Sequence, residues 1–181
     1  MQKELITSDI HTIRKEARQH LEQGAVTASY SADRTKVLER LNASLATELV
    51  CVMRYRRHYF MARGIHARGV AEEFLAHSNE ELGHADRIAA RIVQLGGEPD
   101  FNPEGLAIRS HAEYVPGTSL VDMIREDLVA ERIAIDSYRG FIQFLAHDDP
   151  TTSSMLKEIL AVEEEHADEL ADLLEDLPGK S

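Results

Sequence analysis

The sequence predicts an all-α protein built as a four-helix bundle, and three observations carry this prediction. Apolar residues recur at alternating spacings of three and four along four long segments, as on the buried face of a helix. Most of the 5 prolines and 10 glycines lie outside these segments. The motif Glu-x-x-His occurs twice, at Glu81–His84 and Glu163–His166, and residues three apart share one face of a helix. A length of 181 residues is typical of one domain with a substantial core.

Composition excludes several classes of protein. The net charge of −12 argues against non-specific binding of nucleic acid, which needs a basic surface. The single cysteine, Cys51, excludes an internal disulfide framework and CxxC motifs, and it is interpreted as a small buried apolar residue. The N-terminal residues contain no apolar run of signal-peptide or transmembrane length, so we expect a cytoplasmic protein without a membrane partner.

Residues 1–30 are predicted to form an extension that precedes the bundle. A short amphipathic helix is expected to begin after Ser8 or Asp9 and to stop at Gly24. Its apolar positions are Ile10, Ile13, Ala17 and Leu21. Its basic residues are balanced by acidic ones, which favours a helix lying on the bundle or on a neighbouring subunit over a DNA-binding arm.

The first two long helices are predicted over residues 33–62 and 70–95. The inward stripe of the first carries Leu38, Leu41, Leu45, Glu48, Val52, Tyr55 and Tyr59. The inward stripe of the second carries Ala71, Phe74, Ser78, Glu81, Ala85, Ile88, Ile92 and Leu95. Each apolar stripe therefore holds a glutamate near its middle, where burial is expected.

A long crossover, residues 96–118, separates the second helix from the third and is predicted to hold a helical turn near 104–109. The third helix is expected over 119–146, with Asp127, Glu131 and Tyr138 on its inward face. Asp149-Pro150 predicts the start of the fourth, because Asp caps a helix and Pro suits its first position. Pro178-Gly179 is expected to close a bundle domain of residues 31–178, followed by a tail of 179–181.

The two halves of the chain repeat one arrangement of side chains. Glu48 precedes Glu81 by 33 residues, and Glu131 precedes Glu163 by 32. One carboxylate from each of two helices, with Glu-x-x-His from each of the other two, is the ligand set of di-iron and di-manganese carboxylate bundles. The predicted metal ligands are Glu48, Glu81, His84, Glu131, Glu163 and His166.

Electrostatics supports the same interpretation. Burying an unpaired carboxylate costs several kcal/mol, and no Lys or Arg lies on the inward stripes near the four glutamates. Two divalent cations would neutralise four carboxylates. Oxygen and nitrogen ligands without thiolate suit iron or manganese, with zinc as an alternative.

Several neighbours of this constellation allow two interpretations. Tyr55 follows Glu48 by seven residues, and its role is either redox chemistry and ligand orientation or simple packing. Tyr138 follows Glu131 by seven residues and is interpreted as a packing residue. Asp127 is a candidate for orienting a metal-bound histidine. His77 either guides ions or is a satisfied polar residue. The other histidines (11, 20, 58, 66, 111 and 147) are interpreted as surface or packing residues, and Glu164 and Glu165 as facing solvent or a neighbour.

The chain resembles the bacterioferritin branch of the ferritin-like superfamily over about residues 35–175. The resemblance is carried by Leu41-Asn42 through Glu48-Leu49, Tyr55, Glu81-x-x-His84-Ala85-Asp86-Arg87, Leu95-Gly96-Gly97 and Glu163-Glu164-Glu165-His166. It implies a ferritin-like four-helix bundle with a ferroxidase di-iron centre at the six predicted ligands. The two Glu-x-x-His glutamates would bridge the irons, and Tyr55 would be the catalytic tyrosine beside them.

The chain also departs from that family. The family's haem-binding methionine is replaced by Leu82, so we expect no haem. We expect no fifth helix of the kind found in 24-subunit shells. Its N-terminal extension and crossover resemble Dps-like proteins with bacterioferritin-type sites, so a twelve-subunit shell is favoured over 24. Some of those proteins carry a cysteine pair near the centre, which Cys51 alone does not supply.

The function implied by the resemblance is oxidation of Fe²⁺ with O₂ or H₂O₂, for iron storage, detoxification and protection against oxidative stress. One alternative uses the same ligands without a storage cage, as a manganese-catalase-like peroxidase or a di-iron hydroxylase of the demethoxyubiquinone type. A second alternative is a DNA-protecting shell, which the net charge of −12 disfavours.

Overall fold

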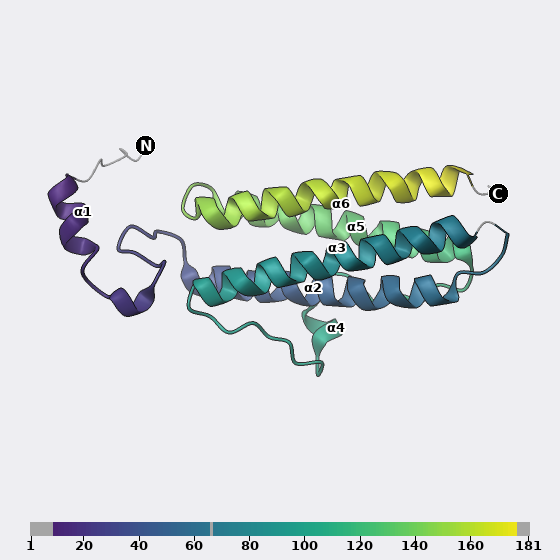
Figure 1. Ribbon diagram of the computed structural model, residues 1–181, viewed down its shortest axis with the longest axis horizontal. Helices are drawn as coiled ribbons and strands as arrows, with labels where there is room; N and C mark the ends of the chain where they lie inside the picture. Colours follow the sequence, from purple (N-terminus) through teal and green to yellow (C-terminus); the bar gives the residue numbers. More distant parts are fainter. Residues whose placement is uncertain (1–8, 66, 177–181) are drawn as a thin grey trace.

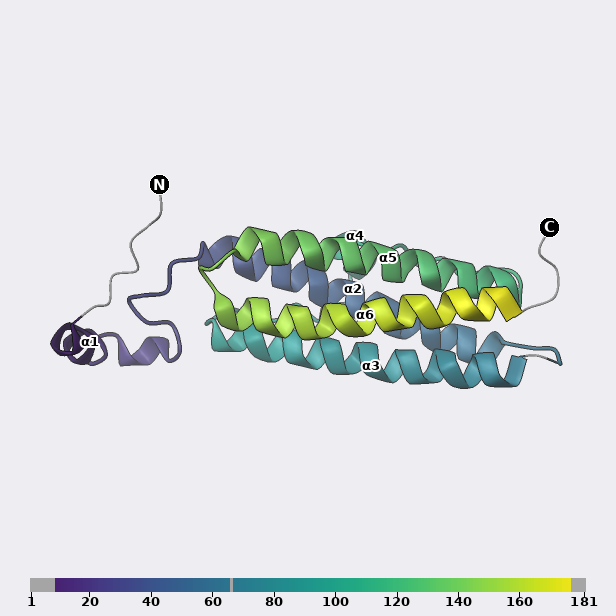
Figure 2. The ribbon, with the colours of Figure 1, turned by 90° about the horizontal axis from the view of Figure 1, so that it is seen from above.

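The computed structural model describes residues 9–65 and 67–176, and every regular element in these ranges is a helix, which confirms the predicted all-α class. Four long helices lie side by side as a bundle (Figures 1 and 2). They are α2 (Arg34–Met61), α3 (Ala67–Gln94), α5 (Leu120–Leu145) and α6 (Pro150–Asp176). Within the described part of the chain, no helix combines the length and apolarity needed to cross a bilayer.

The bundle is assembled from two helical hairpins. Helix α2 packs along α3 and α5 along α6, while contacts between α2 and α5 and between α3 and α6 join the two pairs. Two apolar clusters fill the interior. The first includes Leu41, Ile88, Phe141 and Leu156, and the second includes Phe74, Ile124 and Leu170. The glutamates of the predicted metal site occupy the level between these clusters, because Glu48, Glu81, Glu131 and Glu163 fall between cluster residues along their helices.

Aspartates cap the starts of two long helices, and the cap at Asp149 was predicted. The Asp33 carboxylate accepts a hydrogen bond from Lys36 N at the start of α2. The Asp149 carboxylate accepts one from Thr152 N (2.9 Å) where α6 begins at Pro150. The predicted bounds hold within one residue at these starts, but α3 begins at Ala67, three residues before the predicted position.

The crossover lies along the outside of α2 (Figure 1) and contains the predicted helical turn, α4 (Leu106–Arg109). Asn42 anchors its beginning, because its side chain accepts from Asp100 N (2.8 Å) and donates to Glu98 O (3.2 Å). Arg54 anchors its far end by donating to Glu113 O (2.9 Å). These contacts hold the crossover parallel to α2, so α5 starts at the opposite end of the bundle and runs antiparallel to α2.

The N-terminal extension differs from its prediction in extent. Helix α1 (Ile10–Glu16) begins after Asp9, whose side chain makes no capping hydrogen bond, and a separate 3-10 turn, η1 (Leu21–Gln23), follows. A single helix to Gly24 is wrong, because α1 ends at Glu16 and His20, in the left-handed conformation (φ 51°, ψ 43°), precedes a separate turn. The apolar residues of α1 and η1 stay exposed, with Leu21 at 75%, so no burial against the bundle extends the helix.

Some predicted features lie outside the described residues. These are Ser8 as a cap, His66, the end of the bundle at Pro178-Gly179 and the tail of 179–181. The division of the chain at residues 30 and 178 and the placement of the extension against a neighbouring subunit stay predictions.

Candidate metal centre

Six side chains from four helices meet at the centre of the bundle. Helix α2 contributes Glu48 and α5 contributes Glu131, while α3 and α6 each contribute a Glu-x-x-His pair. All six are buried, with at most 5% of any residue exposed. The predicted ligand set is therefore brought together in the structure, and its members are Glu48, Glu81, His84, Glu131, Glu163 and His166.

The six residues form two overlapping groups of potential ligands. Glu48 and His84 belong to one group, Glu131 and His166 to the other, and Glu81 and Glu163 belong to both. Within each group, one ligand atom from every residue lies within 4.8 Å of the others. Each position thus has one carboxylate and one imidazole of its own, and two shared carboxylates lie between the positions. Two adjacent cations held by these groups would share Glu81 and Glu163.

The hydrogen-bond pattern of the centre also fits cations. Five of its buried atoms have no hydrogen-bond partner among the described residues: Glu48 Oε2, Glu81 Oε1, both carboxylate oxygens of Glu163, and His166 Nδ1. Buried polar atoms are almost always paired, because an unpaired one costs about 1–3 kcal/mol. Carboxylate oxygens and imidazole nitrogens that converge in this way suit a shared metal ion.

Burial and mutual contacts raise the pKa values of four groups at the centre. Burial and the charge of Glu81 raise the pKa of Glu48 to about 8, and burial with the charge of Glu81 raises the pKa of Glu163 well above its usual range. Burial alone would favour neutral His84, but its contacts with Glu48 and Glu81 outweigh burial and raise its pKa to about 10. The pKa of His166 is raised to about 9, because contacts with Glu81 and the charge of Glu131 outweigh burial.

Two tyrosines brace the terminal glutamates symmetrically. The Tyr55 hydroxyl on α2 donates to Glu131 on α5, and the Tyr138 hydroxyl on α5 donates to Glu48 on α2. Burial raises the pKa of both tyrosines well above the usual range, so both hydroxyls keep their protons. The interpretation of Tyr138 as a packing residue missed this contact. The equal spacing of seven residues after each single glutamate was the available signal.

The outer side of His166 is also contacted by polar groups. Its Nε2 lies 2.6 Å from Glu80 Oε2, which fixes the ring so that Nδ1 faces Glu81 at 3.6 Å. The ring of His77 stacks on that of His166 with centroids 3.9 Å apart. Glu80 is thus the carboxylate that orients a candidate metal-ligating histidine, the role predicted for Asp127.

Asp127 has a different role from the predicted one. Its carboxylate accepts from Arg54 Nε (2.8 Å) and lies 2.7 Å from His58 Nδ1, so it contacts neither His84 nor His166. Arg54 lies beside the predicted inward stripe of α2 and is nevertheless buried, with 1% of the residue exposed. Because its charge is paired with Asp127, Arg54 leaves the four glutamates without an arginine or lysine partner among the described residues.

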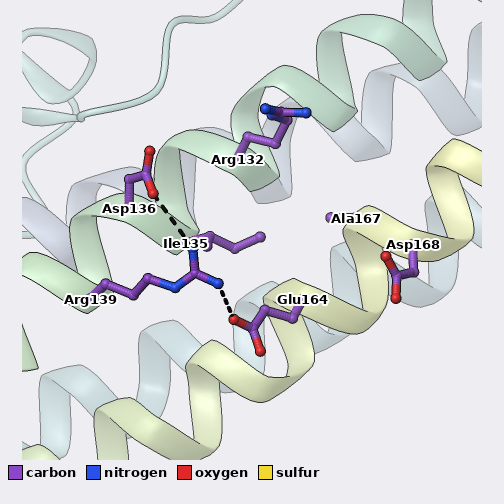
Figure 3. A pocket seen from close by; sticks show the side chains of 7 residues that line it. All are labelled: Arg132, Ile135, Asp136, Arg139, Glu164, Ala167 and Asp168. Carbon is purple, nitrogen blue, oxygen red and sulfur yellow. Dashed lines mark hydrogen bonds and ion pairs between the residues drawn. The ribbon is translucent and has the colours of Figure 1, made fainter.

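Two residues outside the centre agree with their predicted places. Cys51 is 3% exposed, and burial raises the pKa of its thiol well above the usual range. Glu164 points outward and pairs with Arg139 of α5 at 2.5 Å, on the wall of a surface pocket of about 410 Å³ (Figure 3). Neither residue contributes to the two ligand groups.

A pocket of about 340 Å³ leads from solvent to the outer faces of the histidines. It lies between α3 and α6 and is lined by His77, His84 and His166 at its floor. Its remaining polar walls are four glutamates and one arginine: Glu73, Glu80, Glu165, Glu169 and Arg87. A cavity with this excess of negative charge attracts cations.

Comparison with known proteins gives consistent relatives. Residues 38–179 match the family described as Ferritin-like domain. The bacterioferritin of Rhodobacter capsulatus is 31% identical over 135 residues, which cover 74% of this chain and 79% of that protein. A similar solved structure is that of a dodecameric thioferritin, the bacterioferritin-related protein from Bacteroides fragilis. Its TM-score against this chain is 0.77 at 33% sequence identity, and the match covers 80% of this chain and 88% of that one. Dps from Thermosynechococcus elongatus shares the fold (TM-score 0.75, 19% identity, covering 81% and 93%).

Proposed function

The chain belongs to the ferritin-like family, and we propose that it is a ferroxidase that oxidises Fe²⁺ with O₂ or H₂O₂ for iron storage and protection against oxidative stress. The observation that carries the proposal is the pair of overlapping ligand groups that share Glu81 and Glu163. Sharing of two carboxylates holds two substrate ions adjacent, so that one oxidant can accept one electron from each.

The reaction balances with two Fe²⁺ per peroxide. Each Fe²⁺ gives one electron to H₂O₂, the O–O bond breaks, and two protons complete two molecules of water; with O₂ the same two electrons and two protons give H₂O₂. Iron is preferred on this ligand set, which has oxygen and nitrogen atoms and no thiolate, with manganese and zinc as alternatives.

The residues of the chain would supply position, charge and protons. Glu48 and His84 would hold one ion, and Glu131 and His166 the other, with the shared glutamates between them. Tyr55 and Tyr138 would orient the terminal carboxylates through their hydroxyl groups. Tyr55 has the stronger case for a catalytic role, since its hydroxyl also lies 3.3 Å from His77 Nδ1 and so connects the centre to the pocket.

We propose that the protein forms a homo-oligomeric shell without haem. Support for twelve subunits comes from the B. fragilis relative, which is described as dodecameric. Support for the absence of haem comes from Leu82, because an aliphatic side chain cannot ligate iron as a thioether does.

The decisive experiment compares Glu163→Gln with Glu164→Gln. The substitution Glu163→Gln removes one shared carboxylate, whereas Glu164 is the adjacent exposed residue and is the matched control. Anaerobic protein loaded with Fe²⁺ is mixed with O₂ or H₂O₂, and ferric absorbance is followed by stopped flow. We expect Glu164→Gln to oxidise iron like the wild type and Glu163→Gln to lose at least tenfold in rate. Equal rates in all three proteins would exclude the centre as the site of oxidation.

The mass of the particle in solution, measured by light scattering, separates the alternative functions. A twelve-subunit particle that also gains an electron-dense iron core on oxidation supports storage. A monomer or dimer that binds two metals would favour a manganese-catalase-like peroxidase or a di-iron hydroxylase. Retention of duplex DNA by the shell would favour a DNA-protecting role, which the net charge of −12 opposes.

A further inference from the structure

Gly83 lies in the interior of a long helix, where neither the backbone nor the packing requires a glycine. It stands inside α3, next to the candidate ligand His84, and its backbone is helical, so any residue could adopt it. A Cβ atom added to Gly83 would meet no neighbouring atom of the described residues within 4 Å. Glycine is among the poorest helix formers, because it loses the most backbone entropy when a helix forms. Its presence at this position therefore points to the open space beside it.

That open space is the pocket between α3 and α6, which lie side by side in the bundle (Figures 1 and 2). Gly83 lines the pocket together with Glu80 and Arg87, which stand three residues before it and four residues after it. Residues at these spacings share one face of a helix, so a side chain at position 83 would project into the same pocket. The pocket ends at the candidate ligands His84 and His166. The missing side chain thus leaves room on the way to the centre.

The repeat within the bundle shows what a side chain at this position would do. The counterpart of Gly83 on α6 is Glu165, because each stands one residue before the histidine of a Glu-x-x-His motif. Both residues line the pocket, one from each of its two helical walls. One wall therefore carries a long carboxylate side chain and the other carries none. Long side chains at both positions would narrow the pocket from both sides.

The pocket suits the passage of a hydrated divalent cation. A water molecule takes about 30 Å³ of liquid volume, so an ion with six waters needs about 180 Å³. The pocket volume of about 340 Å³ accommodates it. Three other surface pockets formed by the described residues are lined by none of the six candidate ligands. The walls of this pocket also attract cations, through four glutamates: Glu73, Glu80, Glu165 and Glu169.

We propose that Gly83 determines the width of the passage through which divalent cations enter and leave the two-metal centre. The inference rests on the proposed function in so far as the six residues bind metal, but it does not require that the metal be oxidised. A bulkier side chain at position 83 would raise the barrier to passage and leave the free energies of the free and bound ion unchanged. Association and release would therefore slow by the same factor. A residue that shaped the ligands would instead change the affinity.

Cobalt tests the passage without redox chemistry. Binding of Co²⁺ to the full chain is followed by stopped-flow absorbance, and release is followed after addition of a chelator. Gly83→Leu should slow association at least tenfold and release by the same factor, with an unchanged Kd. The control is Gly140→Leu, because Gly140 is also interior to a long helix, has open space around an added Cβ, and lies on α5 outside the pocket. It should exchange Co²⁺ like the wild type, while Glu163→Gln should lose the signal of ions bound at the centre.

A thiol at position 83 allows the width to be varied within one folded protein. The variant Gly83→Cys is labelled with methanethiosulfonates of increasing size, and the native Cys51 does not compete because it is 3% exposed. Association of Co²⁺ should slow progressively with the size of the label and should recover when a reductant removes it. The same labels on Gly140→Cys should leave the rates unchanged.

Two results would overturn the role of Gly83. One is wild-type exchange of Co²⁺ in Gly83→Leu and in every labelled protein. The other is a changed Kd with unchanged association, since position 83 would then act on the ligands and not on the passage. Oxidation of Fe²⁺ by the wild type is scored separately. Slow Co²⁺ exchange in Gly83→Leu without iron oxidation by the wild type would refute the proposed function alone, and the reverse pattern would refute the passage alone.

Discussion

Metal loading of the centre should release protons, and the number follows from the pKa values of the ligands. At pH 7, Glu48 with a pKa of about 8, His84 of about 10 and His166 of about 9 are each protonated in the metal-free protein. Glu163 joins them because its pKa is raised well above the usual range. Coordination requires carboxylate and neutral imidazole, so filling the centre should displace about four protons per chain.

The assay uses calorimetric titration of metal-free protein with Mn²⁺ at pH 7, in buffers with different ionisation enthalpies. The slope of observed enthalpy against buffer ionisation enthalpy gives the number of protons released. Manganese avoids the protons that accompany iron oxidation. The variant Glu48→Gln, which carries no displaceable proton at that position, should release about one proton fewer if it still binds metal. Release of fewer than one proton by the wild type would refute the proposal that protons occupy the ligand atoms of the metal-free centre.

Three further predictions concern stability and bracing. Folding raises the pKa values of Glu48 and His84 to about 8 and about 10, so the stability that their bound protons contribute is lost as pH rises. The loss occurs between about pH 4.5 and 8 for Glu48 and between about pH 6.5 and 10 for His84. The melting temperature of metal-free protein should therefore fall from pH 6.5 to pH 9, while that of metal-loaded protein should not. Tyr138→Phe removes the hydrogen-bond donor to Glu48, so it should lower the free energy of urea unfolding of metal-loaded protein by about 1–3 kcal/mol. One of the two ions should also bind more weakly. Unchanged affinity for both ions would contradict the bracing role. Asp127→Leu leaves Arg54 charged, buried and unpaired, and it should lower the free energy of unfolding by about 3–5 kcal/mol. Adding Arg54→Met in the same chain should recover most of that free energy. If the double variant is as unstable as Asp127→Leu, packing and not the buried charge determines the loss.

The bundle and its centre were largely predictable from the sequence, because helix periodicity determines which side chains face inward. Glu48 and Glu81 stand on stripes of apolar residues, and a residue on such a stripe is buried wherever the helix packs. The doubled Glu-x-x-His motif then placed two imidazoles at the same level. Agreement between burial and ligand chemistry made the prediction specific.

Contacts between helices were harder to predict, because periodicity gives the face of a residue and not its partner. Asp127 is inward-facing as predicted, but Arg54 and His58, one turn apart on α2, reach it first. Glu80, which contacts His166, lies beside the predicted stripe of α3 and is reached only because α6 packs there. Which of two acidic residues orients a histidine depends on the rotation of each helix about its axis, and a single sequence does not specify that rotation.

The N-terminal extension shows a second limit. Ile10, Ile13 and Leu21 follow a helical pattern, yet the helix ends at Glu16. A short helix gains most of its stability from packing of its apolar face, and these residues remain exposed in the protomer. The pattern therefore indicates a surface that another chain could cover, without fixing how far the helix extends.

The measurement that tests the two-metal centre most directly is a crystal structure of protein loaded with Fe²⁺ without oxygen, with diffraction collected above and below the iron absorption edge. Two anomalous peaks about 3.5–4 Å apart are expected. One should be coordinated by Glu48 and His84 and the other by Glu131 and His166, with Glu81 and Glu163 between them. A single peak, or iron bound only outside these six residues, would contradict a two-iron centre in this bundle.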